Sequence, residues 1–183
     1  IGHYYIKGSK FRETSNPSSI YGEFQLNEQM IQKKYFDLVM FGHVHLHQSL
    51  YNDDRIIVLG SIDRIDMGER DSKKYYAIYE PERDKLEFKE IQCRTLLKNE
   101  IEVPKSIKQM TEYILQKLPN QDIVKNAECQ IIVKYTKGKH IQIDKKAIEQ
   151  YFSDSFYTNI LYVEQSEEDL HHLRSVNLAP LTL

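Results

Sequence analysis

The sequence contains little of what marks several large classes of protein. Only two of its 183 residues are cysteines, so it has neither a disulfide framework nor the closely spaced cysteines of a zinc site. Its longest apolar runs, such as residues 38–41, are far shorter than the roughly 20 residues of a membrane-spanning helix. No basic and apolar secretory segment opens the chain. These absences favour a reducing, cytoplasmic setting with no membrane partner.

The charge is nearly balanced, which excludes a strongly basic nucleic-acid-binding protein. The chain has 25 basic residues against 27 acidic ones, although local basic patches are not excluded. Apolar residues make up 40% and charged residues 28%, as in an average folded domain. At 21.7 kDa the chain is long enough for one large domain or two small ones.

The pattern of apolar residues changes along the chain. Residues 36–98 contain short strand-like segments separated by polar turns, which is typical of one part of a β-sandwich. Residues 99–183 instead predict alternating strands and helices, in the order β-α-β-α-β-α. We therefore predict an α+β protein with two domains, residues 1–98 and residues 99–183.

Several elements can be placed from caps, prolines and periodicity. The expected elements are a strand over residues 1–6, a loop over residues 9–19, a short helix capped by Asn27, a strand over residues 36–41, a hairpin turning at residues 52–54, a hairpin turning at residues 81–84, a helix from Pro104 to Pro119, a strand over residues 129–135, a helix capped by Asp144, a strand over residues 159–163 and a final helix from Ser166.

Three of the seven histidines crowd together directly after the strand-like run of residues 36–41. His43 and His45 are two residues apart, so both can reach the same side of an extended chain. Neutral imidazole is a common ligand of zinc, manganese and iron. His3 ends another apolar run and can join them, whereas His47 is the weakest candidate. The alternative is that His-x-His is merely a partly exposed, polar strand end.

Two segments around these histidines resemble known motifs. Residues 36–45, FDLVMFGHVH, resemble the last metal-binding motif of the calcineurin-like metallophosphoesterases. Residues 59–69, LGSIDRIDMGE, resemble a signature of one branch, the SbcD-type DNA nucleases, which work with an SbcC-type ATPase in double-strand-break processing. The usual signature has proline where this chain has Leu59, and the residue after the second histidine is often basic where this chain has Leu46. The resemblance is specific over residues 36–79, is weaker before them, and extends only to the architecture after Lys98.

The resemblance implies a fold and a metal centre. Residues 1–98 would be the C-terminal half of the metallophosphoesterase β-sandwich, and residues 99–183 the small α+β capping domain that helps to position DNA. Family members hold two Mn²⁺ ions, and by that pattern His3 and His43 would bind one ion and His45 the other. A metal-activated water would then attack the phosphodiester.

Much of the family's apparatus has no counterpart in this sequence. The Asp-x-His, Gly-Asp-x-x-Asp and Gly-Asn-His-Asp motifs precede the His3 motif in the family, and they supply every carboxylate ligand and the proton-donating histidine. Three imidazoles alone suit zinc, copper or nickel better than Mn²⁺, which prefers oxygen ligands. The interpretation is therefore the C-terminal part of a nuclease, nearly inactive alone and containing no catalytic residue of its own. Residues 1–98 are expected to pair with the N-terminal half of the same protein, and the complete protein is expected to be a homodimer.

Contacts with DNA are weakly indicated by the sequence. Lys137 and Lys139 belong to a local basic run that can contact phosphate, although a solvated hairpin explains them equally well. Arg64, inside the signature segment, can orient a phosphate or pair with Asp66 or Glu69, and we favour the pairing.

Two further functions compete with the nuclease. The first is a metallophosphoesterase of another branch, acting on nucleotides or phosphoproteins. The second is a non-catalytic module that binds DNA or a partner and keeps only vestigial metal residues.

Overall fold

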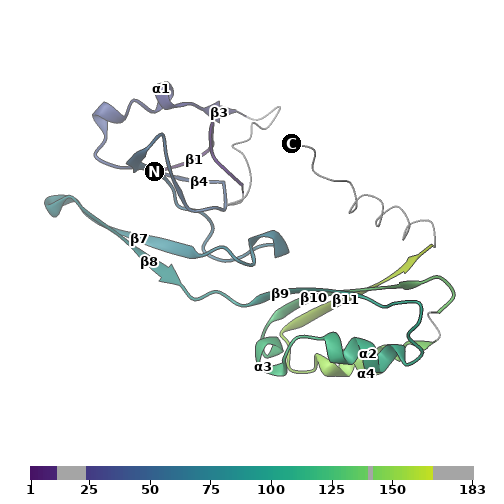
Figure 1. Ribbon diagram of the computed structural model, residues 1–183. Coiled ribbons are helices and arrows are strands. Elements are labelled where there is room, and N and C mark those ends of the chain that lie inside the picture. The colour runs from purple at the N-terminus through teal and green to yellow at the C-terminus, as the bar shows by residue number, and fades with distance from the viewer. Residues whose placement is uncertain (12–23, 140–141, 167–183) are drawn as a thin grey trace, which may run out of the picture. The chain divides into compact units, whose positions relative to one another are not determined.

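The computed structural model describes residues 1–11, 24–139 and 142–166 (Figure 1). The chain divides into two compact units, Ile1–Arg94 and Thr95–Leu183. Helices and strands are mixed and the strands form several sheets, which agrees with the α+β class. The division precedes the expected boundary at Lys98, because Leu96–Glu102 forms strand β9 and pairs with a strand of the second unit.

The largest sheet of the first unit is mostly parallel. Its strands are β1 (Gly2–His3), β4 (Val39–Gly42), β6 (Asp53–Val58) and β5 (Gln48–Leu50), in the order β1-β4-β6-β5. The first three run parallel, whereas β5 pairs antiparallel with β6. The strand predicted over residues 36–41 is thus confirmed as an interior strand, but it begins only at Val39, and Phe36 is exposed.

The hairpin between β5 and β6 turns earlier than the sequence indicates. Tyr51 and Asn52 both adopt positive φ angles, 58° and 55°, as in the tight turn that suits strand twist. Asp53 and Asp54 are therefore already in β6, and the turn lies at residues 51–52 instead of the predicted 52–54.

Smaller elements complete the first unit. They are the parallel pair β2 (Tyr5–Ile6) and β3 (Gln25–Leu26), helix α1 (Glu28–Ile31), the 3-10 turns η1 (Lys33–Tyr35), η2 (Met67–Glu69) and η3 (Pro81–Arg83), and the antiparallel hairpin of β7 (Lys74–Glu80) and β8 (Lys85–Ile91). The predicted cap is confirmed, because the Asn27 side chain accepts a hydrogen bond from the Met30 amide. The predicted loop over residues 9–19 lies mostly outside the described residues.

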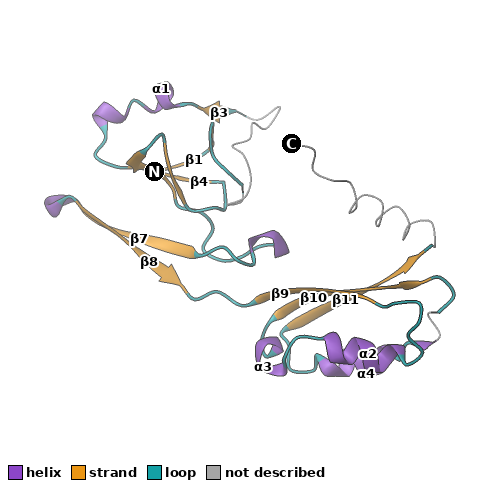
Figure 2. Cartoon of the chain, viewed as in Figure 1, coloured by secondary structure: helices purple, strands orange, loops and turns teal. Residues whose placement is uncertain are grey.

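The second unit is a parallel sheet with helices on one face (Figure 2). Its sheet has the order β11-β10-β9, with β10 spanning Glu128–Thr136 and β11 spanning Tyr157–Gln165. Helices α2 (Met110–Lys117), α3 (Gln121–Val124) and α4 (Lys145–Tyr151) connect the strands. Alternate residues of β10 are buried in the core of this unit: Cys129, Ile131, Val133 and Tyr135.

The helix predicted from Pro104 begins only at Met110. The Val103 amide still bonds to the Lys134 carbonyl at the end of the sheet, and the Ile107 amide closes a turn onto the Pro104 carbonyl. The chain therefore needs several residues to leave the sheet before a helix can start. The predicted cap at Asp144 is confirmed by its bond from the Ala147 amide, and the helix predicted from Ser166 lies outside the described residues.

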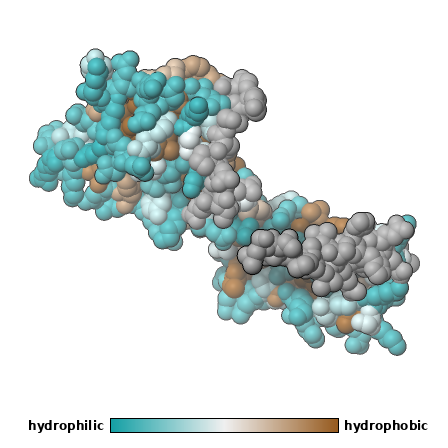
Figure 3. Space-filling model, turned by 45° about the horizontal axis from the view of Figure 1, so that its top comes forward, coloured by the Kyte–Doolittle hydropathy of each residue, from teal (hydrophilic) through white to brown (hydrophobic). Residues whose placement is uncertain are grey.

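The surface in view in Figure 3 is mainly hydrophilic, with scattered apolar patches. Among the described residues, no helix combines the length and the apolar character needed to cross a bilayer.

Candidate metal centre

Two of the three predicted ligands lie together at the carboxyl ends of neighbouring parallel strands. β1 and β4 pair with His3 opposite Gly42, so His43 follows directly beyond the strand end. The His3 and His43 rings lie edge to face, with their centres 5.4 Å apart. A Cβ atom on Gly42 would lie 2.9 Å from Nδ1 of His3, so a residue without a side chain is needed under this ring.

The backbone at His43 is in an uncommon conformation. Its φ angle is 95°, in the left-handed half of conformational space that residues other than glycine seldom adopt. Val44 and Leu46 are buried on either side of His45 and anchor the loop. Strained backbone of this kind is typical of sites where the surrounding structure enforces a functional geometry.

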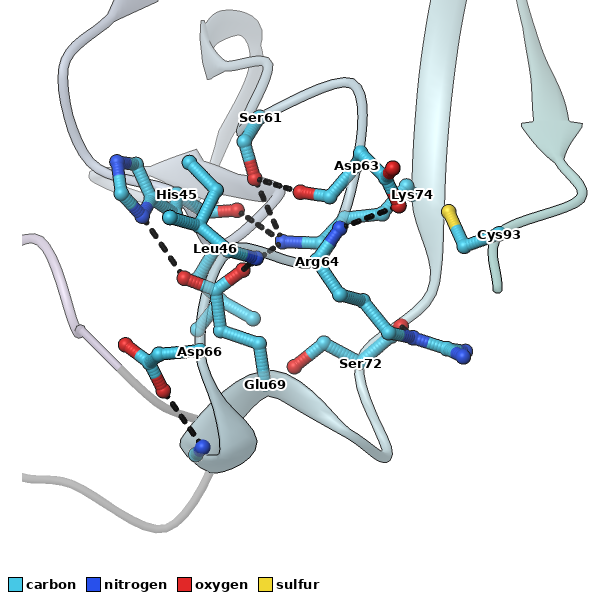
Figure 4. Close-up of polar contacts among 12 residues, drawn as sticks. His45, Leu46, Ser61, Asp63, Arg64, Asp66, Glu69, Ser72, Lys74 and Cys93 are labelled. Carbon is cyan, nitrogen blue, oxygen red and sulfur yellow. Dashed lines mark hydrogen bonds and ion pairs between the residues drawn. The ribbon is translucent and has the colours of Figure 1, made fainter. Parts of the chain in front are cut away.

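The third predicted ligand, His45, is bound by a buried carboxylate (Figure 4). Nδ1 of His45 lies 2.8 Å from Oε1 of Glu69, whose side chain is 8% exposed, whereas the imidazole is 44% exposed. The second oxygen, Oε2, accepts hydrogen bonds from Nζ of Lys74 at 2.7 Å and from the Ile65 amide at 3.3 Å. The carboxylate therefore has a donor on each of its oxygens.

Lys74 is almost completely buried and bonded three times. Its side chain is 1% exposed, and Nζ donates to the carboxylate of Glu69, to Oγ of Ser61 at 2.8 Å and to the carbonyl of His45 at 3.0 Å. All three ammonium protons thus have acceptors, which is what a buried lysine requires.

Hydrogen bonding decides the charge of Glu69. Burial alone would raise the pKa of this carboxyl, but the hydrogen bonds from Lys74, His45 and the Ile65 amide outweigh it and hold the pKa below its usual range. Glu69 is therefore a carboxylate at neutral pH.

The segment that resembles the nuclease signature wraps around His45. Gly60 has φ of 85°, and a Cβ atom on it would lie 2.7 Å from the His45 carbonyl oxygen. The Ser61 amide donates to the same oxygen at 3.1 Å. The signature segment therefore fixes the backbone of the histidine loop.

The neighbouring His47 has a structural environment. Its ring packs against Tyr75 and Phe88, with centres 4.8 and 4.6 Å away, and its Nδ1 lies 3.3 Å from the Leu59 carbonyl. Burial lowers the pKa of His47, which favours the neutral ring. Of the histidines at positions 43, 45 and 47, His47 is therefore held by packing and is not a candidate metal ligand.

Two of the three predicted DNA contacts, Arg64 and Lys139, have hydrogen bonds within the chain. Arg64 donates from Nε to the Ser72 carbonyl at 2.9 Å and from Nη1 to the Arg94 carbonyl at 3.1 Å. Glu69, which is with Asp66 one of its two predicted partners, is bound by Lys74. In the second unit, Lys139 donates to the Lys105 carbonyl at 2.6 Å. Lys137 is exposed in the turn after β10.

The His3–His43 pair fits one part of a metal site. Two imidazoles that share an ion at about 2.1 Å per nitrogen have ring centres about 5 Å apart, close to the separation seen here. Within the ranges that the structure describes, however, no three or more His, Cys, Asp or Glu side chains are grouped to hold a metal. The three imidazoles thus do not form a single three-ligand group within the described part of the chain.

From the sequence, Glu69 is expected only as a partner of Arg64, and no function is expected for Lys74. A signal is nevertheless present, because Lys74 opens a strand with three tyrosines, where a lysine on the buried side requires a carboxylate partner. Comparison of the chain with models of known families, and with curated proteins, finds no match.

Proposed function

We propose that this chain is the C-terminal part of an SbcD-like, metal-dependent DNA nuclease that works with an SbcC-type ATPase in double-strand-break processing. The observation that supports it best is the meeting of His3 and His43 at the carboxyl ends of two parallel strands. Crevices at such ends are the usual ligand sites of parallel sheets. In this proposal the first unit belongs to a β-sandwich, the second caps it, and the protein acts in the cytoplasm as a homodimer.

The chain's own residues would serve as metal ligands or hold those ligands in place, and none of them would transfer protons. His3 and His43 would hold one Mn²⁺ ion and His45 the other. When bound, such ions supply an activated water and stabilise charge on the phosphate oxygens. Gly42 leaves room for the His3 ring, and the strained φ of His43 aims the second ring toward the first. The strain, about 1–3 kcal/mol for such a residue, is tolerated where it serves a site.

Apolar surface next to β1 supports pairing with the N-terminal half of the protein. A cavity of about 300 Å³ is lined by apolar residues of several elements, Leu26, Ile31, Leu38, Val39 and Phe41 among them. Large apolar side chains around it are exposed: Ile1, Tyr4, Met30 and Phe36. Contiguous apolar surface of this kind marks an interaction face, and β1 is an edge strand that can accept another.

The test is complementation. The chain is combined with a polypeptide that carries the Asp-x-His, Gly-Asp-x-x-Asp and Gly-Asn-His-Asp motifs, and Mn²⁺-dependent cleavage of linear duplex DNA is measured. We expect activity from the combination and almost none from the chain alone. His3→Ala, His43→Ala and His45→Ala should abolish activity, whereas the exposed control Glu82→Ala in η3 should not.

The two competing functions give different results in the same assay. Cleavage of a small phosphodiester or a nucleotide without cleavage of DNA would identify another metallophosphoesterase branch. Unchanged DNA cleavage in His45→Ala would instead favour the non-catalytic module.

A further inference from the structure

We propose that Glu69 and Lys74 are positioning residues that fix the tautomer and direction of the His45 ring, so that its Nε2 lone pair is presented to a divalent cation. This inference rests on the proposed metal role of His45 and adds two residues to it.

The first step concerns the proton on the imidazole. An ionised carboxylate can only accept hydrogen bonds, so at 2.8 Å Nδ1 of His45 must be the donor. In a neutral ring with the proton on Nδ1, Nε2 carries a lone pair. Metal-binding histidines commonly donate their other N–H to a carboxylate in this manner. Figure 4 shows the second ring nitrogen of His45 pointing away from Glu69, and the side chain as a whole is 44% exposed.

The second step concerns the rigidity of the carboxylate. The ammonium of Lys74 binds Oε2 of Glu69 and also the backbone carbonyl of His45. A closed loop therefore runs from the His45 ring through Glu69 and Lys74 back to the His45 main chain. Neither the ring nor the carboxylate can turn without breaking one of these hydrogen bonds.

A purely structural ion pair would not need this geometry. Replacing a buried ion pair by apolar residues is often neutral for stability, so such a pair is weak evidence of a structural role. Here one carboxylate oxygen is directed to an imidazole that is 44% exposed, where packing gains little. The arrangement aims a ring at solvent, which is what a ligand requires.

The replacement Glu69→Gln gives a sharp test, because an amide has only one oxygen. Lys74 and the Ile65 amide lie on one side of the carboxylate and require that oxygen. The amide NH₂ group would then face Nδ1 of His45 and donate to it. The proton of the ring should move to Nε2, the atom proposed to bind metal.

Long-range ¹H–¹⁵N NMR of the imidazoles in the chain measures the tautomer directly. We expect Nδ1–H for His45 in the wild-type chain and Nε2–H in Glu69→Gln. The matched control is Glu87→Gln, a partly exposed carboxylate of β8 held by Lys85 and Lys89, which should leave His45 unchanged. An Nε2–H tautomer in the wild-type chain would overturn the proposal even if Glu69→Gln did not fold. An unchanged tautomer in a folded Glu69→Gln chain would overturn it as well.

A second measurement connects the tautomer to metal. Binding of Mn²⁺ alone to the chain combined with its N-terminal half is followed by electron paramagnetic resonance. Glu69→Gln should weaken binding about 10- to 100-fold, the usual effect of removing a ligand's hydrogen-bond partner, and Glu87→Gln should not. Equal affinity of wild type and Glu69→Gln would refute the positioning role and leave the proposed function standing. Absence of wild-type Mn²⁺ binding would refute both.

Discussion

Replacing Gly60 by alanine should destabilise the first unit through a backbone collision at the histidine loop. The new Cβ atom would lie 2.7 Å from the His45 carbonyl oxygen and 2.9 Å from the His47 amide nitrogen. Both are main-chain atoms, so no side-chain rotation relieves the contact. The loop must move, and the bonds that the His45 carbonyl accepts from Ser61 and Lys74 must lengthen or break.

The magnitude follows from these terms. A left-handed backbone with a side chain costs about 1–2 kcal/mol, and each of two lost hydrogen bonds costs about 1 kcal/mol. The free energy of unfolding of the first unit should therefore fall by about 3–4 kcal/mol.

The matched control for this substitution is Gly138→Ala. Gly138 has φ of 83°, nearly the 85° of Gly60, but no described atom lies within 4 Å of its Cβ position. Only the conformational term of about 1–2 kcal/mol remains there. Urea denaturation followed by circular dichroism measures both variants, with the transition of each unit assigned separately. If Gly60→Ala is no more destabilising than Gly138→Ala, Gly60 does not lie in close contact with the His45 carbonyl, and the predicted backbone collision is refuted.

Three further predictions address strain, burial and DNA contact. His43→Gly should be about 1 kcal/mol more stable than His43→Ala in urea denaturation, because glycine adopts a positive φ without strain. Both variants should lose Mn²⁺ binding. Equal stability of the two variants would show that His43 is unstrained. Burial raises the pKa of Tyr162 to about 12, with added repulsion from Glu149 and Asp144. The stability that the neutral phenol contributes is complete below pH 10 and is lost as pH rises through 12. The free energy of unfolding of Tyr162→Phe should therefore fall less than that of the wild-type chain over this pH range, and an identical fall would contradict this. Lys137→Glu should weaken binding of unrelated duplexes about equally and reduce the salt slope by about one in the combined protein; unchanged affinity in filter binding would exclude this lysine as a phosphate contact.

Local signals in the sequence predict local structure well. Asn27 and Asp144 cap their helices because a short polar side chain can accept a main-chain hydrogen bond wherever a helix begins. The second half of the apolar run over residues 36–41 forms the interior strand β4, which begins at Val39 and buries Phe41. These features depend on a few neighbouring residues, all of which are visible in sequence.

The errors arise where distant pairing decides the structure. Leu96–Glu102 mixes apolar and charged residues and is a strand only because it pairs with β10, some thirty residues later. The helix predicted from Pro104 starts late for the same reason, since the sheet holds the chain up to Val103. The bond between Glu69 and His45 joins residues 24 positions apart, and no local pattern indicates which partner the carboxylate selects.

The shortness of β1 sets an order in which the proposed centre would assemble. His3 is held by a strand of only two residues at the edge of its sheet, whereas the other two imidazoles follow β4 in the interior. Edge strands of this length open at little free-energy cost, so amide hydrogen exchange should be fastest around residues 2–3. A cation that binds both His3 and His43 would hold β1 against β4. Binding of the cation would therefore slow amide exchange in β1 more than in the other strands of the sheet.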